Sequence, residues 1–366
     1  MTRETVDRRT MMKAASFGAL AGAATSLPRV AAANANGGEA AAAPTGKTHR
    51  FEMTIEERAV RVARGLNARV WAYEGQVPGP LIRVREGDRV EATVTNNTRG
   101  QHTIHWHGVY QTGSWRSDGV PGITQTAIGS GGKTGTYSFL ADKPGSLWYH
   151  CHVGVPNHVG IRGMWGPLIV DPAEPLPIEK EVTKDAILMF SSWNSSVAED
   201  YFGAEDPTGK LDFFSINGKA FPDTQPIRVR KGDVLRLRLY AVSADVAFHL
   251  HGHDMMVTHQ DGRALAEPQY ADTVYVAMGQ RKDVVVHMNN PGRWAAHDHQ
   301  EHHISNGGSA PGGIFTVVEY EEVKDDPWYY WARKEFDPDF YFIESMQSGY
   351  GLIQQPQFRG EPLKGG

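Results

Sequence analysis

The chain of 366 residues contains a single cysteine, so no disulfide can form within it. Its charges are mixed and nearly balanced, with 37 basic and 42 acidic side chains, and they form neither a basic patch nor an acidic run. This composition argues against nucleic acid as a partner and favours small molecules. Apart from a short segment near the N-terminus, no apolar run is long enough to cross a membrane.

The one cysteine, Cys151, lies between two histidines, His150 and His152. Because successive side chains of a strand point to opposite faces, the two imidazoles can bind metal on one side and the thiolate on the other. A blue-copper site takes two histidines, one cysteine and a weak axial methionine. The loop after Cys151 supplies His158 and Met164, and the remaining histidine lies upstream, at His102.

The other histidines follow a pattern that chance does not readily explain. A lone cysteine is usually an inert, buried apolar residue, and an isolated histidine is usually no ligand. Of the 16 histidines, however, eight fall in His-x-His pairs. The pairs are His105/His107, His150/His152, His249/His251 and His297/His299.

Two similar segments precede the first and third pairs, which indicates an internal duplication. Residues 77–88 contain Ile-Arg-Val-Arg-Glu-Gly-Asp, and residues 225–233 contain Ile-Arg-Val-Arg-Lys-Gly-Asp. Each half continues with alternating apolar and polar residues, as in 89–95 and 234–240, broken by Gly, Pro and Asn turns. The sequence therefore predicts two β-sandwich or barrel domains, divided by the proline-rich residues 171–178.

The N-terminus resembles an export signal. Arg8 and Arg9 precede an apolar stretch, residues 14–24, that is too short for a permanent membrane span. This pattern is typical of a twin-arginine signal peptide. We expect cleavage after Ala35, a flexible leader to residue 47, and a mature protein in the periplasm or outside the cell.

The motifs together are similar to those of the multicopper oxidases, and specifically of the two-domain, small laccase-like members. They are His105-Trp106-His107-Gly108, His150-Cys151-His152 and His249-Leu250-His251-Gly252-His253. The resemblance covers roughly residues 50–322 and implies an all-β chain with two cupredoxin-like Greek-key β-barrel domains. Domain 1 would span residues 48–172 and domain 2 residues 179–322, followed by an aromatic tail, 323–366. The implied activity oxidises phenolic or similar donors one electron at a time and reduces dioxygen to water.

The resemblance also implies roles for the ligands and a count of four copper ions per chain. The type 1 copper would sit in domain 1, because the matching domain 2 positions carry Val246 and Asp298. His303, five residues after Asp298, resembles the vestige of a lost site. The type 1 ligands would be His102, Cys151, His158 and Met164; the type 2 ligands His105 and His249; and the type 3 ligands His107, His150, His152, His251, His297 and His299.

Three further expectations follow. The usual type 1 loop places its second histidine at the position of Pro156, but His158 is the histidine available here. Asp118 matches a family Asp-Gly segment near the type 2 copper and is expected to relay protons, although Asp-Gly also forms simple turns.

Each domain holds too few histidines for three coppers, so the cluster must form where a domain 1 meets a domain 2. Two-domain relatives close into a homotrimer, and the aromatic tail is a candidate for packing across that ring.

Two alternatives remain at this point. A copper nitrite reductase is also a trimer of two-domain chains, but it needs only one further copper and three histidines. A non-catalytic blue electron-transfer protein would leave the four histidines of domain 2 without a use. Copper content separates the three, with four ions per chain for an oxidase, two for a reductase and one for a carrier.

Overall fold

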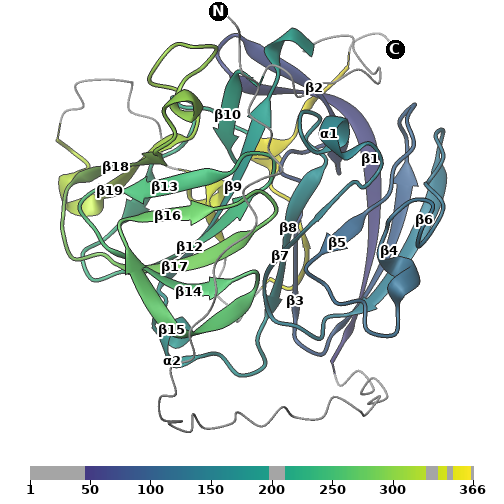
Figure 1. The fold of residues 1–366 in the computed structure, drawn as a ribbon, viewed down its shortest axis with the longest axis horizontal. Coiled ribbons are helices and arrows are strands. Elements are labelled where there is room, and N and C mark those ends of the chain that lie inside the picture. Colours follow the sequence, from purple (N-terminus) through teal and green to yellow (C-terminus); the bar gives the residue numbers. More distant parts are fainter. Residues whose placement is uncertain (1–45, 198–210, 327–336, 344–348, 364–366) are drawn as a thin grey trace, which may run out of the picture. The chain divides into compact units, whose positions relative to one another are not determined.

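A computed structural model describes residues 46–197, 211–326, 337–343 and 349–363. The described residues are built almost entirely of strands, which form four sheets, and the predicted all-β fold class is confirmed (Figure 1). Two short helices, α1 (Val155–His158) and α2 (Pro177–Glu181), interrupt the strands. Among the described residues, no helix combines the length and apolarity that a membrane span requires. The twin-arginine segment lies outside the described residues.

Domain 1 is a sandwich of two five-stranded sheets. One sheet has the order β2-β1-β4-β6, with β22 beside β1, and the other has the order β21-β3-β8-β7-β5. Alternation in the sequence produces this packing: in β4, Val90, Ala92 and Val94 are buried while their neighbours are not. The strands are β1 (Thr48–Ala63), β2 (Leu66–Tyr73), β3 (Leu81–Arg85), β4 (Arg89–Asn96), β5 (His105–His107), β6 (Lys133–Leu140), β7 (Gly145–His150) and β8 (Trp165–Asp171).

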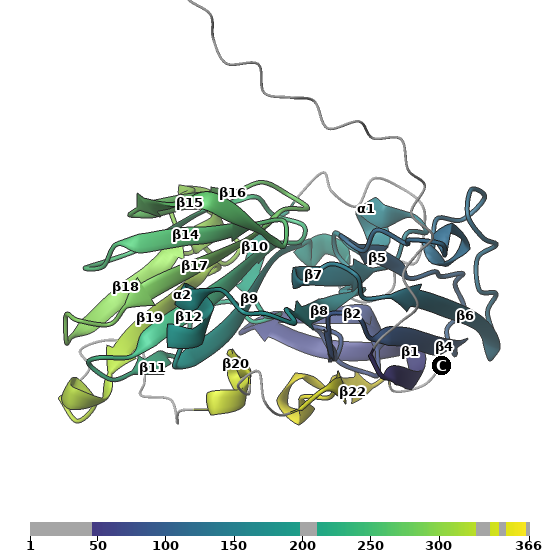
Figure 2. The same ribbon diagram turned by 90° about the horizontal axis from the view of Figure 1, so that it is seen from below.

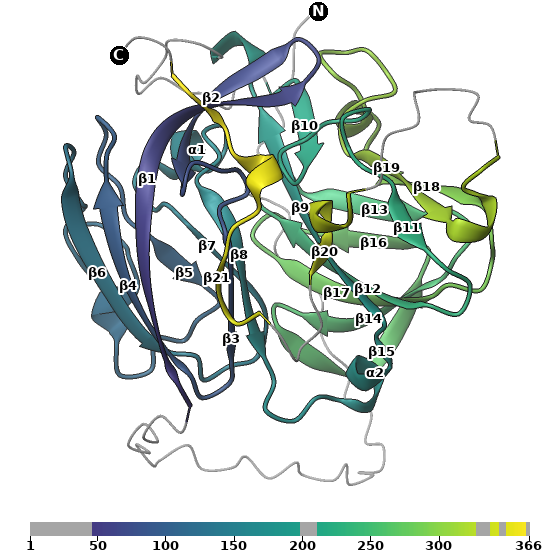
Figure 3. The ribbon, with the colours of Figure 1, turned by 180° about the vertical axis from the view of Figure 1, so that it is seen from behind.

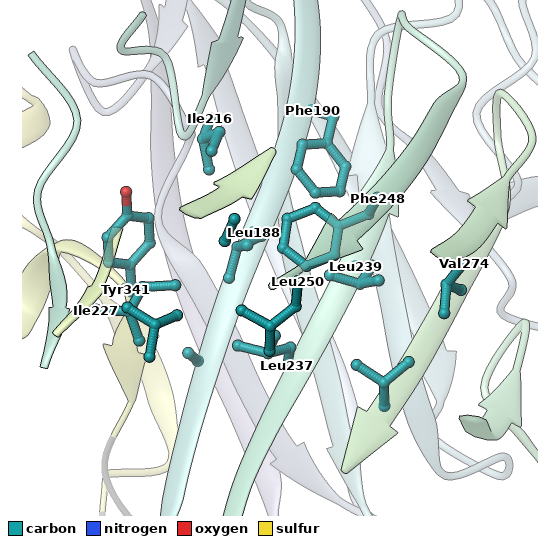
Figure 4. Packing of buried hydrophobic residues seen from close by; sticks show 14 of the residues in the cluster. Leu188, Phe190, Ile216, Ile227, Leu237, Leu239, Phe248, Leu250, Val274 and Tyr341 are labelled. Carbon is teal, nitrogen blue, oxygen red and sulfur yellow. The ribbon is translucent and has the colours of Figure 1, made fainter. Parts of the chain in front are cut away.

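Domain 2 repeats the arrangement with a larger sheet, ordered β10-β9-β12-β17-β14-β15 with β20 beside β9, and a smaller one, ordered β11-β19-β18-β13-β16. Its core lies between them, where Leu188 and Phe190 face Phe248 and Leu250 (Figure 4). The strands are β9 (Lys184–Trp193), β10 (Phe213–Ile216), β11 (Ile227–Val229), β12 (Val234–Ala241), β13 (Val246–Leu250), β14 (Met255–Gln260), β15 (Arg263–Ala271), β16 (Thr273–Val276), β17 (Arg281–His287), β18 (Arg293–Asp298) and β19 (Phe315–Tyr320).

The duplicated segments fold alike. In domain 1 the Asp88 carboxylate accepts the N–H of Arg85 at 2.9 Å, and in domain 2 the Asp233 carboxylate accepts the N–H of Arg230 at 2.8 Å. The glycine between them has a φ of about 90° in both turns, a conformation that glycine adopts without strain. The strand before each turn pairs in parallel, β3 with β8 and β11 with β19. The duplication inferred from the sequence is therefore present in the fold.

A buried polar seam joins the two domains along β7, the strand that leads to Cys151. Ser146 on β7 donates a hydrogen bond to Asp283 at 2.6 Å and accepts one from Arg238 at 2.8 Å. Arg238 is in turn paired with Asp185, and all four side chains are buried. Ion pairs that are buried and fully hydrogen-bonded are costly to break, so this seam fixes the position of β7 against domain 2. Figure 2 shows this boundary, with β9 of domain 2 on one side and β7 of domain 1 on the other.

The described part of the C-terminal tail packs on its own chain. Strand β20 (Phe342–Ile343) pairs with β9, β21 (Gly351–Ile353) with β3, and β22 (Glu361–Pro362) with β1 (Figure 3). Phe340, Tyr341 and Phe358 are buried in the cluster that forms the domain 2 core. These residues therefore tie domain 2 back to domain 1. The aromatic run 328–331 lies outside the described residues.

Candidate metal centres

The first cluster contains His102, Cys151 and His158, whose ligand atoms all lie within 4.8 Å of one another. Cys151 Sγ is 3.1 Å from His158 Nδ1 and 3.7 Å from His102 Nδ1. The far nitrogen of His102, Nε2, lies 2.7 Å from the hydroxyl of Thr98, so its Nδ1 is turned toward the thiol. All three side chains are buried.

The loop between β7 and β8 explains the unusual spacing of His158. Its helix α1 starts after Gly154, whose φ of 52° lies in the left-handed region that favours glycine. One helical turn takes up the extra residues and returns His158 to the thiol, while Pro156 lies in its first turn. Met164 is fully buried, and its carbonyl accepts the N–H of Cys151 at 3.1 Å. The structure thus brings all four proposed type 1 residues to one end of domain 1.

Burial sets the protonation of this cluster. It lowers the pKa of His102 to about 3 and, with the nearby Arg162 cation, that of His158 to about 4, so both imidazoles are neutral and free to bind a cation. Burial also raises the pKa of Cys151 to about 12, so the thiol keeps its proton until a metal displaces it. The indole of Trp71 packs edge-on against both histidine rings, at 5.0 and 4.5 Å between centroids. The result is a dry pocket with two neutral nitrogens and one sulfur.

The second cluster lies on the other side of Cys151. His105, His107 and His150 present ligand atoms within 4.8 Å of one another, and the His152 ring centroid lies 5.4 Å from that of His105. Nδ1 of His150 donates to the carbonyl of Cys151 at 2.9 Å, so its Nε2 faces Nδ1 of His107 at 3.4 Å. A hydrogen bond to one ring nitrogen leaves the other free for a metal.

The side chain of Trp148 packs against this cluster. Its buried indole stacks on His107 and His150, with ring centroids 4.8 and 4.5 Å apart. Burial is the main cause that lowers the pKa of His107 to about 2 and that of His150 to about 3. The charge of Arg281, the first residue of β17, adds to the effect on His107. These imidazoles are therefore neutral donors as well.

Asp118 lies against His105, as the sequence led us to expect. The His105 Nδ1 donates to the Asp118 carbonyl at 2.7 Å, and a carboxylate oxygen of Asp118 is 3.3 Å from the same nitrogen. The following Gly119 has a φ of 84°, and a Cβ there would lie 1.8 Å from the carbonyl oxygen of Ile104. Only glycine lets this segment lie so close to the strand that carries His105. The carbonyl fixes the ring so that its Nε2 points away, toward a metal position.

Domain 2 holds the third group, on β13 and β18. Nδ1 of His249 donates to the carbonyl of Asp272 at 2.8 Å, and Nδ1 of His297 donates to the carbonyl of Asp298 at 2.7 Å. Nε2 of His251 and Nε2 of His297 face each other at 3.1 Å. His299 completes the group, with its ring centroid 5.8 Å from that of His297. His251 and His299 are exposed, so this group is open to solvent in the single chain.

Asp272 is a functional candidate that sequence reasoning missed. It precedes β16, and its carbonyl orients His249 as the carbonyl of Asp118 orients His105. No motif marks it, because a backbone carbonyl carries no residue preference. The pairing of Thr273 with His249 in the β13–β16 register positions it, and only the fold reveals that register.

The two histidine groups stand apart within one chain. Among the described residues, every ring contact within the His-x-His pairs joins members of the same domain. Converging imidazoles, with a buried thiol on the reverse side of the strand end, form a donor set that suits copper. His253 lies outside the group, its Nε2 2.7 Å from the hydroxyl of Tyr320.

Comparisons with known proteins agree with this donor chemistry. Two family models, each described as multicopper oxidase, match residues 54–175 and 192–311. The chain is 32% identical to Oxidoreductase OpS5 of Beauveria bassiana over 68% of its own length and 44% of that protein. It is 29% identical to Laccase-2 of Cryptococcus neoformans var. grubii over 66% of its own length and 44% of the laccase. The chain thus spans less than half the length of these curated relatives.

Solved structures of similar length are closer. The multicopper oxidase mgLAC is 54% identical with a TM-score of 0.84, and the blue copper oxidase of Nitrosomonas europaea is 49% identical with a TM-score of 0.83. Each match covers 87% of this chain and 100% of the other. A copper nitrite reductase of N. europaea, at 23% identity and a TM-score of 0.60 over 76% of this chain and 95% of the reductase, shares the fold alone.

Proposed function

Because this chain belongs to the multicopper oxidase family, we propose that it couples the one-electron oxidation of phenolic or similar donors to the four-electron reduction of dioxygen to water. The observation that carries the proposal is the segment His150-Cys151-His152. Its thiol lies with His102 and His158, and its imidazoles lie with His105 and His107 on the other side. One stretch of three residues thus joins two clusters of metal donors.

We propose that each chain binds four copper ions. His102, Cys151, His158 and Met164 would hold the type 1 ion, His105 and His249 the type 2 ion, and the remaining paired histidines the two type 3 ions. Bound copper supplies one-electron oxidation of the donor at the first site and electron delivery to dioxygen at the cluster. Burial keeps the imidazoles of His102, His107, His150 and His158 neutral. Backbone carbonyls fix the tautomers of His105, His150, His249 and His297, and burial keeps the thiol away from solvent.

Asp118 is the group best placed to supply protons for this reaction. Its carboxylate lies 3.3 Å from His105 Nδ1 and is partly exposed, so it can exchange protons with solvent beside the cluster. General acid catalysis requires a titratable group within hydrogen-bond reach of the reacting atoms or one water away. The same residue's backbone carbonyl orients His105, so the two functions of Asp118 can be separated by substitution.

We further propose a homotrimer in which the domain 1 group of one subunit meets the domain 2 group of the next. Three large apolar side chains of domain 1 are exposed, Tyr110, Trp115 and Ile123, and so are three of domain 2, Tyr270, Tyr275 and Met278. Because contiguous exposed apolar side chains mark protein interfaces, these six are the candidates to be covered between subunits. A head-to-tail contact of two different surfaces closes into a ring when its rotation allows.

The compartment remains a proposal from the sequence. We propose that the twin-arginine segment exports the folded chain to the periplasm or beyond. An export assay with Arg8→Lys and Arg9→Lys, against the unchanged chain, tests this. Accumulation of the double variant inside the cell supports export by this route, and unchanged export contradicts it.

The function is tested by dioxygen uptake with a phenolic donor and by the variant Cys151→Ser. The intact protein should consume one dioxygen for every four donors oxidised. The variant should lose both the blue copper–thiolate absorption and donor oxidation, while the histidine groups keep their copper. The exposed histidine variant His287→Gln serves as a control and should behave as the intact protein. Persistent blue absorption in Cys151→Ser would refute the assignment.

Mixing of subunits tests the shared cluster. One variant lacks His105 and His107, and the other lacks His297 and His299. Each alone should be inactive, whereas hybrid trimers contain a junction between an intact domain 1 and an intact domain 2. Restored oxidase activity in hybrids verified by mass supports the intersubunit cluster. Absence of activity in those hybrids contradicts it, since a cluster within one chain cannot be restored by mixing.

A further inference from the structure

Domain 2 carries a buried acid–base pair at the position that the type 1 site occupies in domain 1. Asp298 ends β18 as Cys151 follows β7, and each lies between two histidines. Nδ1 of His303 donates to the Asp298 carboxylate at 2.6 Å. Asp298 is 0% and His303 4% exposed, and the Phe214 ring lies 4.0 Å from that of His303.

The backbone around this pair reproduces the type 1 loop bond by bond. In domain 1 the Cys151 N–H donates to the carbonyl of Met164 at 3.1 Å, and in domain 2 the Asp298 N–H donates to the carbonyl of Ile314 at 3.0 Å. Ile314 is fully buried, as is Met164. The position of the thiol therefore corresponds to Asp298, and that of the axial methionine to Ile314.

The second histidine follows the same correspondence. The Met164 N–H donates to the carbonyl of His158 at 3.1 Å, and the Ile314 N–H donates to the carbonyl of His303 at 2.9 Å. His303 thus stands where His158 stands, although the loops differ in length. The first histidine is replaced by the buried Val246, three residues before His249 as His102 is three before His105.

Asp298 links the two strands that carry the domain 2 histidines. One carboxylate oxygen accepts the N–H of Ala247 on β13 at 2.9 Å and the N–H of Gln300 at 3.0 Å. The other oxygen binds His303. In addition, the His299 N–H donates to the carbonyl of Ala247 at 2.9 Å. Removing the carboxylate would leave the N–H groups of Ala247 and Gln300 and the His303 imidazole without this acceptor, although the β13–β18 ladder itself would remain.

We propose that the Asp298–His303 pair occupies a former type 1 copper site and replaces the metal's mechanical role with hydrogen bonds. The pair is a positioning device: it holds the loop in the shape that the metal imposes in domain 1, so that His297 and His299 project toward the cluster. The inference rests on the proposed function for what those histidines bind. A carboxylate and a valine in place of thiolate and imidazole also leave each chain with one entry point for electrons, in domain 1.

The positioning role is tested with Asp298→Ala and the conservative Asp298→Asn. Alanine should lower the copper bound by the histidine groups and change their electron paramagnetic resonance spectrum, while the blue absorption of domain 1 stays. Asparagine keeps an oxygen for Ala247 and Gln300 and should restore most of that copper. Glu301→Ala, on the same loop and exposed, is the matched control. Full copper and an unchanged spectrum in Asp298→Ala would overturn the proposal.

The correspondence with a type 1 site is tested by rebuilding it. In a Cys151→Ser background, the changes Val246→His, Asp298→Cys and Ile314→Met should bring back a copper–thiolate absorption band, now from domain 2. If this variant does not fold, Asp298→Cys alone in the same background pairs the new thiol with His303 and should give a cobalt–thiolate band with added cobalt(II). If folded protein shows neither the copper–thiolate nor the cobalt–thiolate band, the correspondence is overturned. Because the readout is an absorption band, it stands even if the intact chain proves not to be an oxidase.

Discussion

Removal of copper should make the stability of this protein fall steeply between about pH 7.5 and about pH 5.5, because buried histidines cannot take up protons. The four histidines with the most strongly lowered pKa values carry most of the effect. Burial is the largest cause in each, lowering the pKa of His102 and His150 to about 3, of His107 to about 2 and of His158 to about 4. In the unfolded chain each returns to about 6.5.

The direction and the size of the change in the free energy of unfolding follow from these pKa values. The pKa of each histidine is lower in the folded protein than in the unfolded chain. Near pH 6 the unfolded chain therefore binds protons that the folded protein does not bind, and the free energy of unfolding decreases as the pH falls below about 6.5. Between these two pH values each histidine lowers the free energy of unfolding by roughly 1.3 kcal/mol, and the four together lower it by roughly 5 kcal/mol. Carboxylates add little in this window, because Asp185 is held below its usual pKa by Arg236 and Arg238 despite its burial.

Urea titrations of the chelated protein, followed by tryptophan fluorescence at the two pH values, measure the loss. His102→Gln should reduce it by about a quarter, since one of four groups is removed, whereas the exposed control His287→Gln should leave it unchanged. Copper-loaded protein should lose much less, because metal holds the imidazoles unprotonated. Equal stability of the chelated protein at both pH values would refute the reasoning.

Three further predictions concern single residues. Met164→Leu should keep the blue absorption and raise the type 1 reduction potential, and an unchanged potential in a redox titration would mean that Met164 only packs. Gly119→Ala should lower the free energy of unfolding by more than the roughly 1–2 kcal/mol that positive φ alone costs, because its Cβ would clash with the carbonyl of Ile104. The control Gly113→Ala, with a φ of 70° and open space around the position, should show only the backbone cost. Equal losses for both variants in denaturant titrations would contradict the clash. Asp118→Asn keeps the carbonyl that orients its neighbour, so copper content should stay while turnover falls on the order of 10²-fold; unchanged turnover would exclude a proton relay.

The sequence predicts the fold class well, and it singles out the histidines and the cysteine that the structure brings together, for a physical reason. Metal chemistry restricts residue type and spacing tightly, so the segment His150-Cys151-His152 indicates metal ligands on whatever strand it lies. The duplicated Arg85–Asp88 and Arg230–Asp233 turns likewise depend on local interactions, and they reappear in the structure as a matched pair.

What the sequence could not predict depends on contacts between distant segments. The return of His158 to Cys151 requires α1, a helix too short to leave a periodic signal. The carbonyl of Asp272 orients His249 through strand register, which no side-chain pattern encodes. The burial of Tyr341 in the domain 2 core could not be predicted either, because an aromatic run reads the same whether it packs on its own chain or on another.

Copper content of the fully loaded protein tests the central claim most directly. The oxidase account predicts four copper ions per chain, measured by mass spectrometry of the metal against protein concentration, with one lost in Cys151→Ser. Two ions per chain would point to a reductase-type arrangement, and a single ion to a simple blue carrier; either result would contradict the account.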